Sequence, residues 1–87
     1  MKEFKCVIAD PIGLHARPAT LLVQAAAKYK SDSRIISGSR EGNLKSIMNV
    51  MALGIKHGAE VTFRVTGEDE EEAVLAIEQA LKTNNLI

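Results

Sequence analysis

The residues of this chain that could carry out covalent chemistry cluster in one short segment, Gly13–Thr20. His15 lies between a glycine-containing loop and the predicted start of a helix, where unpaired backbone N–H groups and the helix dipole favour an anion. The same dipole disfavours the protonated imidazole, so a neutral ring nitrogen would be available as a nucleophile. Arg17 would bring a planar guanidinium to the same anion. This grouping is suited to capturing and releasing a phosphoryl group. The alternative is that His15 only caps the helix and Arg17 is a solvated surface charge.

Ser46 is the second candidate, at the predicted N-cap of a short helix. As a structural residue it would accept a hydrogen bond from a first-turn N–H, and replacing it with alanine would cost roughly 0.5–2 kcal/mol. A phosphate on the same oxygen would be tolerated by the helix dipole, but its negative charge would lie beside Ile47, Met48 and Met51. We therefore expect such a modification to change the stability little and the docking of a partner strongly.

The other polar candidates indicate no chemistry of their own. His57 stands between Lys56 and Gly58, at a helix end or in a loop, and we expect it to be exposed. No metal site is expected, because His15, His57 and Cys6 lack the spacing of metal ligands. Cys6 is the only cysteine, which excludes an intrachain disulfide, and we expect it to be a small, reduced core residue. The chain has no P-loop, dinucleotide-binding glycine pattern or nucleophile-elbow motif.

The hydrophobic pattern predicts the elements that must position these residues. Period-two alternation predicts strands over residues 3–9 and 61–66, with shorter strands over 34–36 and from a turn at 38–39 to about 43. Helical spacing and capping signals predict helices over 16–28, 46–54 and about 70–83. Pro18 falls in the first turn of the first helix, where its fixed φ is suitable. Asp69 and Glu72 are expected to form a capping box at the start of the last helix.

This order of elements, β-α-β-β-α-β-α, predicts an α+β open-faced sandwich. A four-stranded antiparallel sheet would be covered on one face by three helices, because one sheet face and the apolar helix stripes must be buried together. The 87 residues are expected to form a single domain, 1–87. An apolar fraction of 46% and a charged fraction of 25% are typical of a globular protein and exclude a disordered one.

Charge and hydropathy exclude further classes of function. Eleven basic and eleven acidic side chains cancel, which argues against a dedicated nucleic-acid binder. No segment approaches the roughly 20 apolar residues needed to cross a bilayer, and the first residues lack the apolar run of a signal peptide. We therefore expect a cytoplasmic protein without membrane insertion.

Two motifs in register resemble a known family. The first motif, Gly13–Thr20, and the second, Leu44–Met48 with Val50–Gly54, are similar to the histidine-containing phosphocarrier (HPr) family of the bacterial phosphoenolpyruvate-dependent sugar phosphotransferase system. The resemblance covers essentially the whole chain, in length, element order and separation of the motifs, and it implies the same open-faced sandwich. The chain departs from many relatives of the Gram-positive type at Asn49, where they have glycine, and at Ile12, where a small hydroxylated residue is common.

The resemblance implies a general phosphocarrier, and not a conventional enzyme. His15 would accept a phosphoryl group at Nδ1 from phospho-enzyme I and pass it to enzyme IIA domains of sugar permeases. Arg17 would support the phosphoryl group, and Pro18 would shape the helix start. Ser46 would be the target of an ATP-dependent HPr kinase/phosphorylase, and phosphoserine at this position would make the protein a corepressor of a catabolite-control transcription factor. The resemblance implies no cofactor, since the phosphoryl group comes from phosphoenolpyruvate, and no direct contact with nucleic acid.

A flat, partly apolar surface around His15 is expected to dock the partner proteins of a monomeric carrier. Its expected members are Leu14, Thr20, Ile47, Met48 and Met51. Two alternatives stay open. The protein could act mainly in regulation, as an interaction protein that signals through phosphorylated Ser46, although the presence of both His15 and Arg17 argues against this. It could also be a small phosphatase, of acylphosphatase-like size, that hydrolyses its own phosphorylated form.

Overall fold

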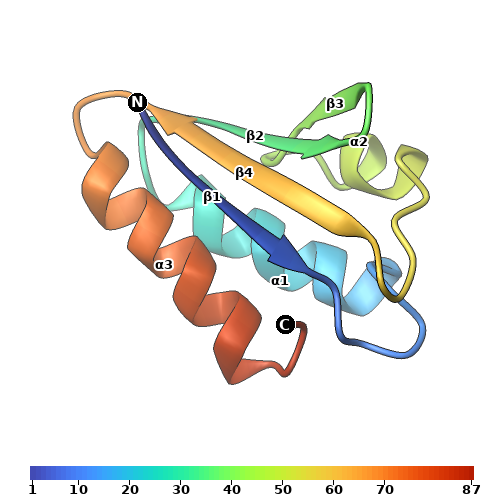
Figure 1. Cartoon of the computed structure of the whole chain (residues 1–87). Coiled ribbons are helices and arrows are strands. Elements are labelled where there is room, and N and C mark those ends of the chain that lie inside the picture. Colours follow the sequence, from blue (N-terminus) through green and yellow to red (C-terminus); the bar gives the residue numbers. More distant parts are fainter.

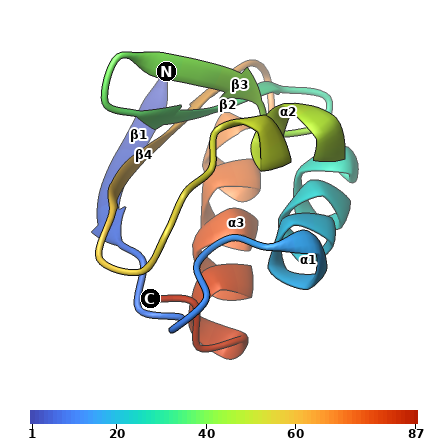
Figure 2. The same cartoon turned by 90° about the vertical axis from the view of Figure 1, so that its right-hand side faces the viewer.

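A four-stranded antiparallel sheet with three helices on one of its faces makes up the protein, as seen in a computed structural model of residues 1–87 (Figures 1 and 2). In chain order the elements are β1 (Lys2–Val7), α1 (Ala16–Ala27), β2 (Asp32–Ser37), β3 (Arg40–Asn43), α2 (Ile47–Ala52), β4 (Glu60–Thr66) and α3 (Glu70–Thr83). The strand order in the sheet is β1-β4-β2-β3. The predicted α+β open-faced sandwich is confirmed.

The core lies between the covered face of the sheet and the helices. Most of it is built from residues at the periods of strands and helices, because alternate residues of a strand and every third or fourth residue of a helix share one face. The inner strand β4 and the two long helices contribute most of its members, which include Val61, Phe63 and Val65 of β4, Ala19, Leu22 and Ala26 of α1, and Ala73, Ile77 and Leu81 of α3. The three helices are thereby fixed against one sheet.

The largest differences from the predicted boundaries lie in two strands and at the end of α2, which stops at Ala52 and not at Gly54. β2 begins at Asp32, two residues before the predicted strand, because Asp32 pairs with Thr66 of β4 and extends the ladder. β1 ends at Val7, two residues before the predicted end at Ala9. The N–H of Ala9 donates to the carbonyl of Leu86 (2.7 Å), so the chain leaves the sheet there and is tied to the C-terminal segment.

The predicted capping box at the start of α3 is wrong. The carboxylate of Asp69 makes no hydrogen bond to its own helix. It accepts from the hydroxyl of Ser31 and from the backbone N–H groups of Lys30 and Ser31 (2.9 Å each). These bonds, the Ser31 hydroxyl first, hold the pKa of Asp69 below its ordinary value. Glu70, and not the predicted Glu72, accepts from an N–H group ahead of the helix.

The structure also places Cys6 and His57, for which the sequence indicates no chemistry. Cys6 is half-buried against the core, and burial, with the nearby Glu78 carboxylate, raises the pKa of its thiol to about 11. The thiol is therefore protonated at neutral pH and a weak nucleophile. His57 is exposed, as predicted. None of the helices combines the length and the apolar character needed to cross a membrane.

Candidate functional site

His15 is the N-cap residue of α1, and hydrogen bonds on both sides fix its backbone. Its φ and ψ are −82° and −169°, in the extended region, and its carbonyl accepts the first helical hydrogen bond from the N–H of Ala19 (3.0 Å). On the other side, the N–H of Leu14 donates to the carbonyl of Ile55 (3.0 Å), and the N–H of His15 donates to the carbonyl of Gly13 (3.0 Å). The loop therefore presents the imidazole at the first turn of the helix.

The first turn of α1 has two backbone N–H groups that find no acceptor in the chain, those of Ala16 and Arg17. The third residue, Pro18, is buried and has no N–H to satisfy. No acidic residue lies in this turn, and the side chain of His15 makes no capping hydrogen bond. The partial positive charge of the helix start is thus free to attract an anion.

The imidazole of His15 is open to solvent, with 39% of its side chain exposed. Its Nε2 lies 4.0 Å from Oδ1 of Asp10, and this oxygen also accepts from the N–H of Ile12 (2.9 Å). At this distance the Asp10 carboxylate faces the Nε2 side of the ring without a hydrogen bond to it. Nδ1 is the other ring nitrogen and the atom expected to react.

One shallow pocket of about 290 Å³ brings the predicted site residues His15, Arg17 and Pro18 together. The other residues that line it are Asp10, Leu21, Asn84 and Leu86. The sequence predicted neither Asp10 nor Asn84 as a site residue. The Asp10-Pro11 turn directly before the His15 loop was a weak signal for the first. No local signal marks Asn84 or Leu86, because the packing of the C-terminal segment brings them to the site.

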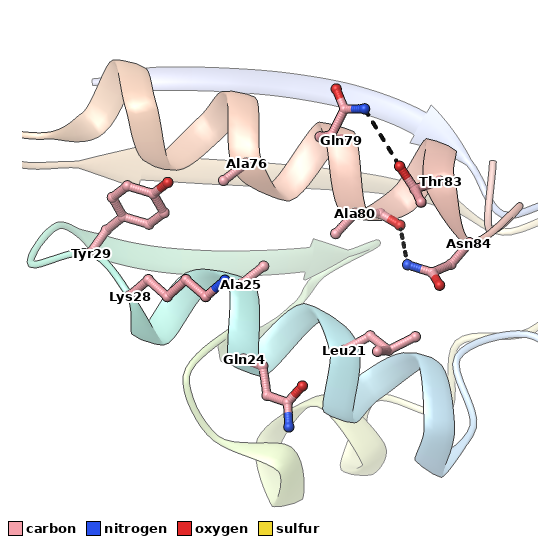
Figure 3. Close-up of a pocket in the computed structure, with 10 residues that line it drawn as sticks. All are labelled: Leu21, Gln24, Ala25, Lys28, Tyr29, Ala76, Gln79, Ala80, Thr83 and Asn84. Carbon is pink, nitrogen blue, oxygen red and sulfur yellow. Dashed lines mark hydrogen bonds between the residues drawn. The ribbon is translucent and has the colours of Figure 1, made fainter.

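A second depression, of about 370 Å³, lies beside the His15 pocket between α1 and α3 (Figure 3). Leu21 and Asn84 line both. The side-chain amide of Asn84, the C-cap residue of α3, donates to the carbonyl of Ala80 (2.8 Å; Figure 3). Lys28 is the only charged residue in the lining. This depression holds no grouping of acid, base and nucleophile, so the candidate site is the pocket of His15.

The helix α2 lies beside α1 and carries an exposed apolar surface (Figure 2). Ile47 and Met51 are each 41% exposed, and Met48 is 82% exposed. Ser46 is the N-cap of this helix, as predicted, and its Oγ accepts from the N–H of Asn49 (3.2 Å). The structure therefore places Ser46 at the edge of the apolar surface.

Leu14 does not belong to this exposed surface, so its prediction as a docking residue is wrong. Its side chain is 4% exposed and is part of the core, together with Ala19 from the beginning of α1. The reason is its position directly before the N-cap residue, from which an apolar side chain packs back onto the first turns of its helix. Thr20 is half-buried, and its hydroxyl donates to the carbonyl of Ala16 (2.8 Å).

Fold and site together define a small α+β protein that presents an accessible histidine at the positive end of a helix. The family model for the HPr component phosphorylation site of the phosphotransferase system matches residues 2–83. The phosphocarrier protein HPr of Mycoplasma genitalium is 49% identical over 88 residues, which cover 100% of both chains. This chain belongs to the HPr phosphocarrier family of the phosphotransferase system.

Solved structures agree with this assignment over nearly the whole chain. A histidine-containing phosphocarrier protein of Mycoplasma superposes with a TM-score of 0.97 at 46% identity, covering 99% of this chain and 98% of the other. Crh, a catabolite repression protein of Bacillus subtilis, superposes with a TM-score of 0.75 at 37% identity, covering 95% of each chain. The shared structure thus includes the elements that carry His15 and Ser46.

Proposed function

We propose that this protein is a general phosphocarrier that takes a phosphoryl group from phospho-enzyme I onto His15 and passes it to enzyme IIA domains of sugar permeases. It acts in the cytoplasm as a single, monomeric domain of residues 1–87. The observation that carries the proposal is the solvent-accessible imidazole at the start of α1, beside two backbone N–H groups without an acceptor. Membership of a phosphocarrier family supports it.

In the proposed transfer, the lone pair of His15 Nδ1 forms a bond to phosphorus while the bond from phosphorus to the donor atom of enzyme I breaks. The ring gains positive charge as this bond forms, and the Asp10 carboxylate beside Nε2 stabilises that charge. The guanidinium of Arg17 and the free N–H groups of Ala16 and Arg17 compensate the charge of the phosphoryl oxygens. Transfer to enzyme IIA is the same attack made by an acceptor atom of that domain. The step needs no metal or organic cofactor.

The direct test is incubation of the protein with phosphoenolpyruvate and enzyme I. We expect stoichiometric phosphorylation in an acid-labile form, as a phosphoramidate would be, and persistence of the label until an enzyme IIA domain is added. An acid-stable phosphate would contradict His15 as the acceptor. Hydrolysis of the phosphorylated protein within minutes, with no acceptor present, would favour the small-phosphatase alternative.

The partners are proposed to dock on the exposed apolar surface of α2, formed by Ile47, Met48 and Met51, together with the accessible part of Thr20. Methionine side chains adapt to differently shaped partners, which suits a carrier that must meet a donor and several acceptors. A small interface suits contacts that are weak and brief.

We propose in addition that Ser46 is phosphorylated by an ATP-dependent HPr kinase/phosphorylase and that this form is a corepressor of a catabolite-control transcription factor. Ser46 is partly exposed and lies directly before the apolar surface of α2. The similarity to Crh, a catabolite repression protein, also supports a regulatory role. If this role is the main one, the protein is chiefly a regulatory interaction partner and only secondarily a carrier.

The variant Ser46→Asp is expected to be charged by enzyme I about tenfold more slowly, which corresponds to roughly 1.4 kcal/mol of docking energy. The added carboxylate places a charge beside Ile47 and Met48, which must be desolvated when a partner docks. The circular dichroism spectrum should be unchanged, because aspartate is as good an N-cap as serine. Ser46→Asn caps equally well and carries no negative charge, so enzyme I should phosphorylate it on His15 at the normal rate. Equal rates for Ser46→Asp and the unmodified protein would contradict the docking surface.

A further inference from the structure

The hydroxyl of Ser46 is held by a side chain that helix capping does not require. Besides the capping bond from the backbone N–H of Asn49 (3.2 Å), the side-chain Nδ2 of Asn49 lies 3.1 Å from Ser46 Oγ. Both groups are donors, so the oxygen accepts two hydrogen bonds from one residue. A serine oxygen has two lone pairs. Both are therefore engaged in this structure.

The amide of Asn49 is fixed in this orientation from the neighbouring strand. The backbone N–H of Asn43, the last residue of β3, donates to Asn49 Oδ1 (3.2 Å). Because Oδ1 faces a donor on β3, Nδ2 is the end of the amide that faces Ser46. The contact between strand and helix is close, since a Cβ at the buried Gly42 would come within 3.3 Å of the Asn49 carbonyl oxygen. The same turn is braced by the N–H of Ser46, which donates to the carbonyl of Asn43 (3.0 Å).

We propose that Asn49 is a positioning residue that restrains the phosphorylation of Ser46; the inference rests on the proposed modification of that serine. In that reaction a lone pair of Ser46 Oγ forms a bond to the γ-phosphorus of a nucleoside triphosphate. The bond from this phosphorus to the β-phosphate oxygen breaks, the nucleoside diphosphate leaves, and the hydroxyl proton passes to a base of the kinase. One of the two donors from Asn49 must release its lone pair before the attack.

The side-chain amide is the donor that is released. The backbone N–H of Asn49 is held in place by the helix, whereas Nδ2 can leave by rotation of the side chain. A chain with glycine at this position has no such donor and keeps one lone pair of the serine free. Asn49 thus keeps Ser46 in a less reactive state without closing the site, and its effect falls on the chemical step rather than on docking.

The test is the steady-state phosphorylation of Ser46 by an HPr kinase/phosphorylase, compared between the unmodified protein and Asn49→Ala. Alanine removes both bonds of the amide, the one to Ser46 Oγ and the one that ties α2 to Asn43 of β3, and is itself a good helix former. We expect kcat to rise about 2- to 10-fold, the range for loss of one neutral hydrogen bond, with KM unchanged. Ala52→Gly is the matched control, because it loosens the same helix but leaves the Asn49 amide in place. It should have the kcat of the unmodified protein.

Each outcome separates the inference from the function on which it rests. Equal kcat values for the unmodified protein and Asn49→Ala would overturn the inference and leave the modification of Ser46 standing. An equal rise in Ala52→Gly would also overturn it, since loosening of α2 would then be the cause. If an active kinase phosphorylates neither the unmodified protein nor Asn49→Ala, the regulatory role of Ser46 fails and the inference fails with it. Phosphorylation of Asn49→Ala alone would support the inference in its strongest form.

Discussion

Replacing His15 with alanine is expected to abolish phosphorylation by phosphoenolpyruvate and enzyme I and to leave the fold intact. The variant removes the only imidazole in the pocket that Arg17 and Pro18 also line, so no ring nitrogen remains to form the bond to phosphorus. The side chain of His15 is 39% exposed and caps no helical N–H group, so its loss should change the free energy of unfolding by about 0.5 kcal/mol or less. Phosphate incorporation and urea unfolding, measured on the same preparation, check both expectations.

The chain contains its own control for this experiment in its second histidine. His57 is exposed and lies outside the pocket of His15. His57→Ala should therefore incorporate phosphate at the rate and to the extent of the unmodified protein. Acid-labile phosphate on His15→Ala, or its loss in His57→Ala, would move the acceptor away from the start of α1 and remove the basis of the proposed function.

Periodic parts of the sequence predicted the fold well, because burial in this protein follows the period of each element. Val61, Phe63 and Val65 alternate along β4 and are all fully buried, as a strand with one covered face requires. The same reasoning could not place Leu14. Leu14 lies in a loop, which has no regular period from which buried side chains could be predicted. Its burial depends on the helix that follows.

The candidate site was predictable only where its residues are neighbours in the sequence. His15 and Arg17 were found because the start of a helix is a local signal that carries its own electrostatics. Asp10, in contrast, reaches the imidazole through the shape of a turn. The error at Asp69 has a similar origin, since the capping signal is local but the competing donors on Lys30 and Ser31 belong to another part of the chain. The Asp69 carboxylate accepts hydrogen bonds from donors that only the tertiary structure brings close to it.

Gly13→Ala is expected to lower the free energy of unfolding strongly and, through the same loop, to slow the phosphorylation of His15. Gly13 has a φ of +88°, in the left-handed region that costs a residue with a Cβ about 1–2 kcal/mol. A Cβ there would also collide with the carbonyl oxygen of Ile55 and lie 2.6 Å from Cα of Lys56. Both are backbone atoms, so relief requires movement of the chain, at a further cost of about 1–3 kcal/mol.

The free energy of unfolding is expected to fall by about 2–5 kcal/mol in total for Gly13→Ala. This is a large part of the roughly 5–15 kcal/mol that stabilises a typical small domain. Gly38→Ala isolates the backbone contribution, because Gly38 has a φ of +62° and no atom within 4 Å of an added Cβ. Its free energy of unfolding in urea should fall by only about 1–2 kcal/mol, and enzyme I should phosphorylate it at the normal rate. Gly13→Ala should be charged more slowly even where it is fully folded, because the displaced loop carries His15 away from Asp10 and the free N–H groups. Equal unfolding free energies and equal rates of phosphorylation for the two variants would show that the close approach of Ile55 and Lys56 does not set the position of the imidazole.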